Sequence, residues 1–231
     1  MASPIRIISS MATKQVLADL IALYRQAHPD TVIELESVGG VDAAKRVQAG
    51  EAFDIVALAS NAVAQLTTDG KVVAGSTVDV VRSGVALAVR SGAPHPDIGS
   101  EAAVKQAVLG ARTLGYSTGP SGVQLAKLFE RWGIAEQIKD RIVTAPPGVP
   151  VGSLVAQGEV ELGFQQLSEL MSLEGIDVLG PLPAQIQIIT TFSAGLATAS
   201  TQPEAVRALL AFLVSPATGP TKQRNGMEAA G

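Results

Sequence analysis

The chain has 231 residues, of which 47% are hydrophobic and 16% charged, and its formal net charge is −4. A chain of this length buries roughly 70–75% of the surface of its unfolded form, which suits one large domain or two smaller ones. The acidic balance offers no basic face for nucleic acid, and the absence of cysteine excludes thiolate chemistry and disulfides. No apolar run approaches the ~20 residues of a membrane span. The two histidines, His28 and His95, are scattered, so we expect neither a metal site nor a cofactor.

Strand and helix patterns alternate through the first 70 residues. The β-rich runs at 5–8, 32–35 and 54–58 are each followed by a helical spacing of apolar residues, and this order predicts a mostly parallel sheet with helices on both faces. Ligands bind such sheets at the carboxyl ends of the strands. The candidate binding residues in these turns are Ser9, Ser10, Met11, Ala12, Thr13, Ser37, Gly39, Gly40 and Ser60.

The pattern changes after residue 77. Two β runs, 78–81 and 85–89, are separated by Arg82-Ser83-Gly84 with no helix between them, and a second α/β alternation follows. A long β run at 186–197 then precedes a last helix at 203–214. We therefore predict an α/β fold with two lobes, 1–81 plus 195–231 and 82–194, joined by a two-stranded hinge that lets turns from both lobes close on a ligand.

The segment 114–132 predicts a strand, a hydroxyl-rich turn and an amphipathic helix. The helix would begin at Pro120 or Ser121, and the unpaired N–H groups and positive dipole end of a helix start bind anions and carboxylates. Ser117, Thr118, Ser121 and Gly122 are thus binding candidates. The alternative is an ordinary helix capped by Ser121, but similar turns recur along the chain, which favours binding.

Further candidates lie in the second half. Val149 and Val151 belong to a proline-rich turn before the helix expected at 153–157. Gln165 and Gln166 follow a buried strand at 162–164, and buried amides need partners, which a ligand carboxylate or hydroxyl would supply. Arg82 lies in the expected hinge, where it would either hold a carboxylate with two hydrogen bonds or remain exposed.

The order of several segments resembles the molybdate-binding-protein family of periplasmic solute receptors. These segments are Ser9-Ser10-Met11, 50–56, Ala59-Ser60, 119–122 and 158–164, and together they span the whole chain. The resemblance implies a type II periplasmic-binding-protein fold, a small anionic ligand and delivery to the membrane permease of an ABC transporter. It also implies a periplasmic location, with the signal peptide absent from this sequence, and we expect a monomer.

The molybdate chemistry of that family does not carry over residue by residue. Its members hold the oxyanion with hydroxyls from the first two turns, a tyrosine after the Gly-Phe strand and backbone N–H groups. Here those positions fall near Ala12, on Gly39-Gly40 and on Gln165-Gln166. A small oxyanion needs short donors that converge, whereas glycines open space and leave their N–H groups accessible. We therefore predict a larger organic carboxylate, with genuine molybdate or tungstate binding as an alternative.

The stretches 163–170 and 175–183 resemble a branch of the family that includes aconitate isomerase. This resemblance raises an enzymatic alternative, in which a proton and a double bond move within a tricarboxylate. A proton shift requires a base within hydrogen-bond reach, and Lys14 and Glu169 are the titratable groups near the named turns. A receptor needs no positioned base, so we favour the receptor role and assign no catalytic residue. A regulator's effector-sensing domain is disfavoured, because no helix-turn-helix or basic patch is present.

Overall fold

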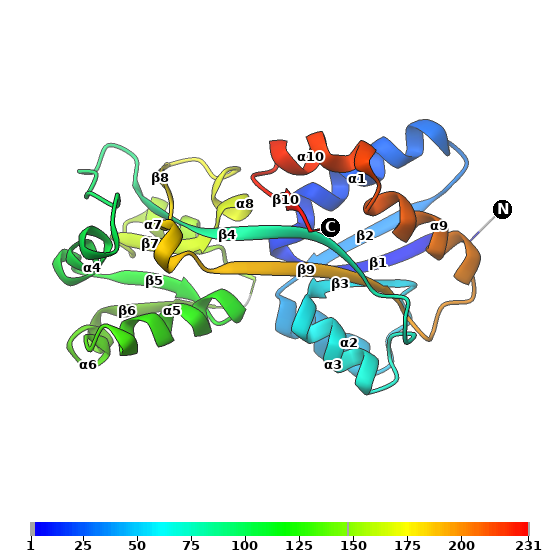
Figure 1. Cartoon of the computed structure of the whole chain (residues 1–231), viewed down its shortest axis with the longest axis horizontal. Coiled ribbons are helices and arrows are strands. Elements are labelled where there is room, and N and C mark those ends of the chain that lie inside the picture. Colours follow the sequence, from blue (N-terminus) through cyan, green and yellow to red (C-terminus); the bar gives the residue numbers. More distant parts are fainter. Residues whose placement is uncertain (1–2, 147, 231) are drawn as a thin grey trace. The chain divides into compact units, whose positions relative to one another are not determined.

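The computed structural model describes residues 3–146 and 148–230, which form two compact units (Figure 1). Unit 1 comprises the described residues of Met1–Arg82 and Thr191–Gly231, and unit 2 comprises those of Ser83–Thr190. The chain passes between the units twice, within strand β4 (Val78–Arg90) and within strand β9 (Ile189–Leu196). The sequence places these divisions at 81/82 and 194/195, and the structure places them at 82/83 and 190/191.

Unit 1 is built on a parallel three-stranded core. Strand β1 (Ile5–Ser10) pairs with β2 (Ile33–Val38) on one side and with β3 (Ile55–Ala59) on the other, and β9 runs antiparallel to β3. The short β10 (Glu228–Ala229) pairs with β4. The helical elements are η1 (Met11–Thr13), α1 (Lys14–Ala27), α2 (Gly40–Gln48), α3 (Ser60–Thr68), α9 (Pro203–Leu213), η4 (Pro216–Thr218) and α10 (Gly219–Arg224).

Helices cover both faces of this sheet because successive side chains of β1 point in opposite directions. Ile7 packs into the core shared with α1 and α9, whereas Ile8 packs into the core shared with α2 and α3. In Figure 1, α1 and α9 accordingly lie on the opposite side of the strands from α2 and α3. Each fully buried isoleucine contributes about 1.5–3 kcal/mol of transfer free energy, so this alternation stabilises the sheet from both sides.

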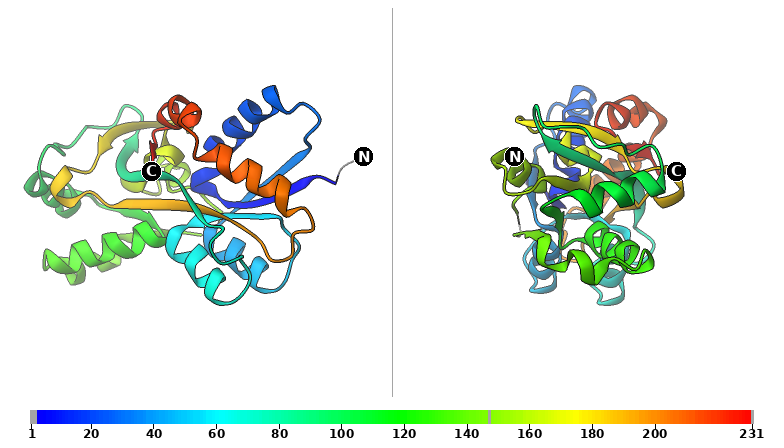
Figure 2. Two further views of the ribbon diagram at one scale, coloured as in Figure 1. Left: turned by 45° about the vertical axis from the view of Figure 1, so that its right-hand side comes forward. Right: turned by 90° about the vertical axis from the view of Figure 1, so that its left-hand side faces the viewer.

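Unit 2 has a mixed sheet. The second half of β4 pairs antiparallel with β7 (Leu162–Gln166) and β8 (Ile176–Pro181), while β5 (Leu114–Ser117) pairs parallel with β7 and with β6 (Ile142–Ala145). The helical elements are α4 (Glu101–Gly110), α5 (Pro120–Arg131), α6 (Ala135–Ile138), η2 (Lys139–Arg141), α7 (Val151–Gln157), α8 (Leu167–Leu170) and η3 (Ala184–Ile186). Helices α4 and α5 pack on one face of the sheet, and α7 and α8 on the other (Figure 2).

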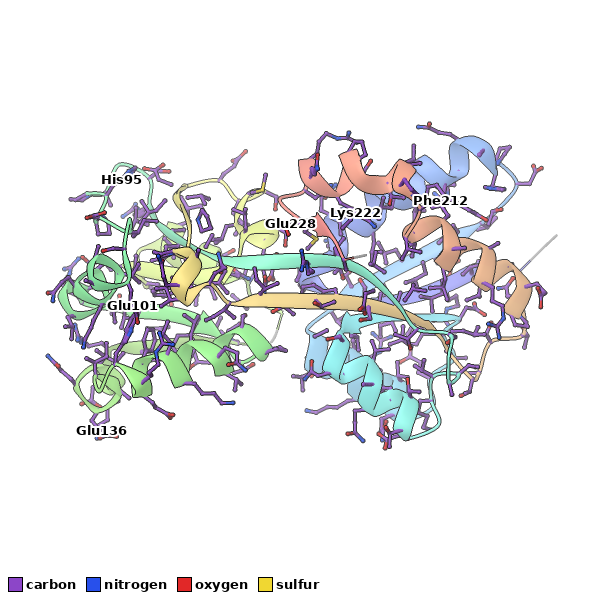
Figure 3. The ribbon with its side chains drawn as sticks, in the orientation of Figure 1. His95, Glu101, Glu136, Phe212, Lys222 and Glu228 are labelled. Atoms are coloured by element: carbon purple, nitrogen blue, oxygen red, sulfur yellow. The ribbon has the colours of Figure 1, made fainter. Side chains whose placement is uncertain are left out.

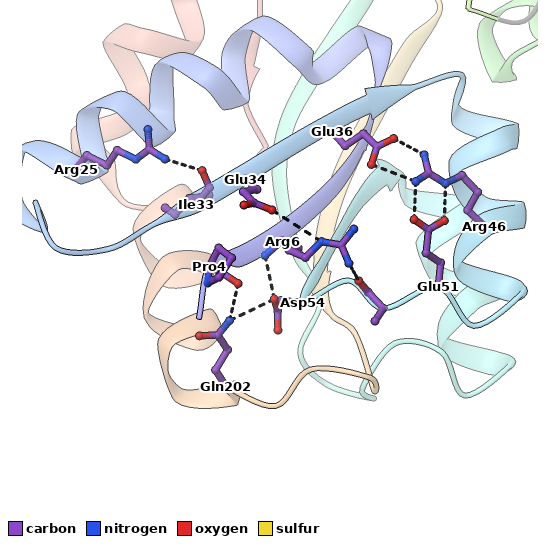
Figure 4. A network of polar contacts seen from close by, with 11 residues as sticks. Pro4, Arg6, Arg25, Ile33, Glu34, Glu36, Arg46, Glu51, Asp54 and Gln202 are labelled. Carbon is purple, nitrogen blue, oxygen red and sulfur yellow. Dashed lines mark hydrogen bonds and ion pairs between the residues drawn. The ribbon is translucent and has the colours of Figure 1, made fainter. Parts of the chain in front are cut away.

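Polar contacts fasten helices within each unit. Glu101 lies at the start of α4 (Figure 3). Its carboxylate accepts hydrogen bonds from Arg131, the last residue of α5, at 2.8 Å and from the indole of the next residue, Trp132, at 2.6 Å. In unit 1, Asp54 accepts from the backbone N–H of Arg6 at 2.9 Å and from the Gln202 amide at 3.3 Å (Figure 4). The second contact joins the residue that precedes β3 to the residue that precedes α9.

Several elements differ from the sequence prediction. The runs 78–81 and 85–89 form one continuous strand, since pairing overrides the weak strand propensity of Ser83-Gly84. The sequence also predicts a helix at about 135–142, whereas α6 ends at Ile138 and β6 begins at Ile142. Ser121 is not a cap, because Gly119 occupies that position and Pro120 begins α5. The sequence places Gln165 and Gln166 after a strand at 162–164, whereas they are the last two residues of β7.

Candidate functional site

The carboxyl ends of the three parallel strands of unit 1 lie side by side. The pairing sets Ser9 opposite both Ser37 of β2 and Ala57 of β3. Directly after these strands the chain enters η1 and α1, α2 and α3. Three helical starts therefore meet this edge, with the backbone N–H groups that lack partners within a helix.

Hydroxyl groups of the first two turns contact each other at this edge. The Oγ atoms of Ser9 and Ser37 are 2.7 Å apart, so the two turns are joined directly. Ser10 Oγ lies 3.3 Å from Thr13 Oγ1, which also donates to the Ser10 carbonyl over 3.2 Å. Ser9, Ser10 and Thr13 are buried. A hydroxyl can donate once and accept twice, so such pairs retain capacity for a ligand.

The start of α2 lies next to the Ser10 side chain. Gly39 occupies the N-cap position, and among the described residues no side chain caps α2. A Cβ atom built on Gly40 would lie 3.6 Å from Ser10 Cβ, which is an ordinary contact. The glycine is therefore not required by crowding, and its absent side chain leaves the helix start uncovered. Met11, Ala12 and Ser60 are half-buried at the same edge.

Unit 2 repeats this arrangement, since α5, α7 and α8 begin soon after the parallel strands β5, β6 and β7 end. A Cβ atom on Gly122 would lie 1.7 Å from the Ser117 carbonyl oxygen, so only glycine lets the first turn of α5 approach the end of β5. Ser121 is buried there and Thr118 is exposed.

Before α7, Val149 is exposed, while Val151 is buried as the first residue of the helix. The proline-rich turn thus presents one of its two candidate valines to solvent. The other belongs to the packed face of the unit.

The two glutamines at the end of β7 point to opposite faces of the sheet, and each is only 4% exposed. Gln165 Oε1 accepts from the Gly152 N–H in the first turn of α7 at 3.1 Å, and its Nε2 donates to Glu169 Oε1 at 2.9 Å. Gln166 Nε2 donates to Thr190 Oγ1 at 2.9 Å.

Glu169 is the titratable group that stands out at this edge. Burial raises the pKa of its carboxyl from the ordinary value of 4.5 to about 7, and the hydrogen bond from Gln165 opposes part of the rise. A carboxyl of that pKa both takes up and releases protons near neutral pH. Lys14, the other titratable candidate, is exposed on α1.

Two residues of β4, Arg82 and Ser83, also lie among the polar residues considered for binding. Arg82 forms an ion pair with Glu228 at 3.1 Å, with its side chain about half exposed, so a ligand carboxylate would compete with that pair. Ser83 is buried, and its hydroxyl has no partner among the described residues. No local sequence pattern singles out Ser83 and Thr190, because only strand pairing shows which buried groups they adjoin.

No helix within 3–146 or 148–230 is long and apolar enough to cross a membrane.

Comparison with known proteins adds an independent observation. Residues 5–228 match the family model described as bacterial extracellular solute-binding protein. The chain belongs to this family. Over 173 residues it is 42% identical to an aconitate isomerase from a Pseudomonas species, a match that covers 74% of this chain and 65% of the isomerase. The chain thus spans slightly less than two thirds of the length of that relative.

Solved structures agree in fold. The periplasmic molybdate-binding protein of Azotobacter vinelandii is 15% identical, with a TM-score of 0.81 over 98% of this chain and 100% of its own. The sulfate-binding protein SubI of Mycobacterium tuberculosis is 14% identical, with a TM-score of 0.81 over 99% of this chain and 88% of its own. The predicted type II periplasmic-binding-protein fold is therefore confirmed, as is the solute-binding family. At these identities the likeness concerns the fold and not the ligand.

Proposed function

We propose that this protein is an extracytoplasmic receptor that binds a small organic carboxylate and delivers it to the permease of an ABC transporter, acting as a periplasmic monomer. The observation that supports it is the set of hydroxyls, amides and helix starts at the strand ends of each unit, above all the Ser9–Ser37 contact and the uncapped start of α2. Neutral donors of this kind bind anions without a buried cation.

The size of the ligand follows from the residues at the positions where the family resemblance expects short donors. Gly39 and Gly40 carry no side chain there, and Gln165 and Gln166 take the place of a tyrosine. Long amide side chains and open backbone suit a carboxylate with a carbon skeleton better than a compact tetraoxyanion.

Thermal unfolding with and without ligand tests this proposal. A ligand that binds only the folded protein raises the melting temperature, by an amount that grows with the logarithm of ligand concentration over Kd. We expect citrate and trans-aconitate to raise it by several degrees at millimolar concentration and molybdate and sulfate to leave it unchanged. A shift with molybdate alone would refute the carboxylate assignment.

A second candidate function is isomerisation of an unsaturated tricarboxylate, and two observations favour it. The chain shares 42% identity with an aconitate isomerase over most of its length, and Glu169 has a pKa of about 7. In this scheme the Glu169 carboxylate removes a proton from the methylene carbon next to the double bond. The electron pair forms the new double bond, and the proton returns at the far end of the three-carbon unit, so no co-reactant is consumed.

Turnover distinguishes the enzyme from the receptor. Incubation with trans-aconitate should yield the cis isomer if the protein is an isomerase, and kcat/KM should rise with pH through a pKa of about 7 as Glu169 ionises. Glu169→Gln should then abolish turnover while trans-aconitate still binds. Binding without any turnover by the wild-type protein would leave the receptor function alone.

A further inference from the structure

Gln166 has one end of its amide group bonded and the other end unpaired. The side chain is 4% exposed, and Nε2 donates to Thr190 Oγ1 at 2.9 Å. Its Oε1 is buried and has no hydrogen-bond partner among the described residues. A buried acceptor without a donor is costly and uncommon in native proteins, so such an atom points to a missing partner.

The sheet places a second unpaired group on the same face. Gln166 lies opposite Val85 in the β4–β7 pairing, and Ser83 precedes Val85 by two residues in the same strand. Side chains two residues apart in a strand share a face. Ser83 Oγ, which is buried and also unpartnered, therefore lies on the face to which Gln166 points.

Gln187, a polar side chain next to β4, is already engaged. Gln187 Oε1 accepts from the N–H of Val85 at 3.0 Å and from its own neighbour Ile188 at 2.8 Å, and its Nε2 donates to the Leu182 carbonyl at 3.3 Å. Gln166 Oε1 receives no hydrogen bond from Gln187 or from any other described residue, and Phe164, which shares the face of Gln166 in β7, is apolar.

With Nε2 of Gln166 donating to the Thr190 hydroxyl, the unpaired atom is the acceptor Oε1, which restricts the chemistry of its partner. An ionised carboxylate has no proton to give, so the carboxylates of the ligand cannot satisfy Oε1. A buried ammonium group would itself need a carboxylate partner, whereas the neighbours of Gln166 on this face include the apolar Val85 and Phe164. A hydroxyl meets the requirement without adding charge.

We propose that Gln166 makes this protein selective for hydroxycarboxylates, with Oε1 accepting a hydrogen bond from a ligand hydroxyl and Ser83 as a further polar contact. This inference rests on the proposed carboxylate function and narrows it. The ligand class is a di- or tricarboxylate with a hydroxyl on its carbon skeleton, as distinct from the same acid without one.

Matched pairs of acids test the inference by calorimetry. Malate and succinate differ by one hydroxyl, as do citrate and tricarballylate. We expect the hydroxylated member of at least one pair to bind about tenfold more tightly or better, as expected for one satisfied buried hydrogen bond. In Gln166→Met the ratio should fall close to one through weaker binding of the hydroxylated acid. Gln185→Met, which changes an exposed glutamine of the same unit, should keep the wild-type ratio.

Each outcome bears on a different claim. Equal affinity for both members of both pairs would overturn the hydroxyl selectivity and leave the carboxylate receptor intact. Aspartate binding more tightly than malate would overturn it in favour of an ammonium donor. Failure of all these acids to bind would overturn the proposed function and this inference with it. The wild-type ratios decide the question even if Gln166→Met does not fold.

Discussion

Gln165 donates from Nε2 to Glu169 Oε1 over 2.9 Å while its own Oε1 accepts from the Gly152 N–H at the start of α7. The amide therefore has a fixed orientation, because only its oxygen can accept from Gly152. Its NH2 group is in consequence directed at the carboxyl of Glu169. This contact ties the start of α7 to the carboxyl whose pKa is displaced most clearly by burial.

Glu169 should make the stability of the protein depend on pH. Burial raises its folded-state pKa from 4.5 to about 7, so between these values the folded state retains a proton that the unfolded state has lost. The contribution of Glu169 to the free energy of unfolding should then fall as pH rises from 4.5 to 7, by at most about 3 kcal/mol. Urea unfolding of Glu169→Gln should lack this fall. Glu174→Gln, at an exposed position, should retain it, and an identical pH profile for wild type and Glu169→Gln would contradict the assignment.

Removing the Gln165 amide should raise the pKa of Glu169 further. The hydrogen bond from Gln165 stabilises the ionised carboxylate and so lowers the pKa against the effect of burial. In Gln165→Met we expect the carboxyl to titrate above about 7, as followed by carbon-13 chemical shift of labelled glutamate. Gln185→Met provides the control, and a lower pKa in Gln165→Met would show that the hydrogen bond does not act on the charged form.

Gly122→Ala should damage the site in unit 2. The added Cβ would lie 1.7 Å from the Ser117 carbonyl oxygen, so α5 must move away from the end of β5. We expect a loss of about 3 kcal/mol or more in unfolding free energy, at the upper end of overpacking effects. Gly119→Ala is the matched control, because its Cβ would meet Ser117 Oγ at 3.5 Å, an ordinary contact. Equal stability of the two variants would mean that the close approach is not required.

Gly40→Ser should change ligand preference more than stability. Its Cβ would lie 3.6 Å from Ser10 Cβ, so the fold should accommodate it within about 1 kcal/mol. The new hydroxyl would cover the uncapped start of α2. We expect affinity for citrate to fall about tenfold, corresponding to roughly 1.4 kcal/mol, as measured by calorimetry. Gly110→Ser, where a Cβ meets open space at the end of α4, should leave affinity unchanged.

The fold could be predicted from the sequence because the local patterns agree with the tertiary structure. The isoleucines of β1 and the spacing of Leu17, Leu20 and Tyr24 in α1 are buried where their periodicity predicts. The turns after parallel strands were identifiable because topology alone brings the carboxyl ends of such strands to one edge. The sequence thus indicates Ser9 and Ser37 as neighbours at this edge, and their Oγ atoms are in contact.

The hydrogen-bond partners and the burial of the polar residues could not be predicted from the sequence, because they arise from packing between distant segments. Thr190 contacts Gln166 across 24 residues, and no local pattern marks either as a partner of the other. The sequence around Ser83 predicts a break between two strands, whereas the strand continues through it and its hydroxyl is buried. Glu169 reads as an ordinary helix residue until the packing of α8 on β7 removes water from it.

Isothermal titration of the wild-type protein with citrate and with molybdate, under the same buffer and ionic strength, tests the central claim most directly. The account predicts saturable micromolar or tighter binding of the carboxylate and no measurable heat from molybdate, because Gly39, Gly40, Gln165 and Gln166 occupy the positions expected of compact oxyanion donors. Tight binding of molybdate with no binding of citrate or trans-aconitate would contradict it.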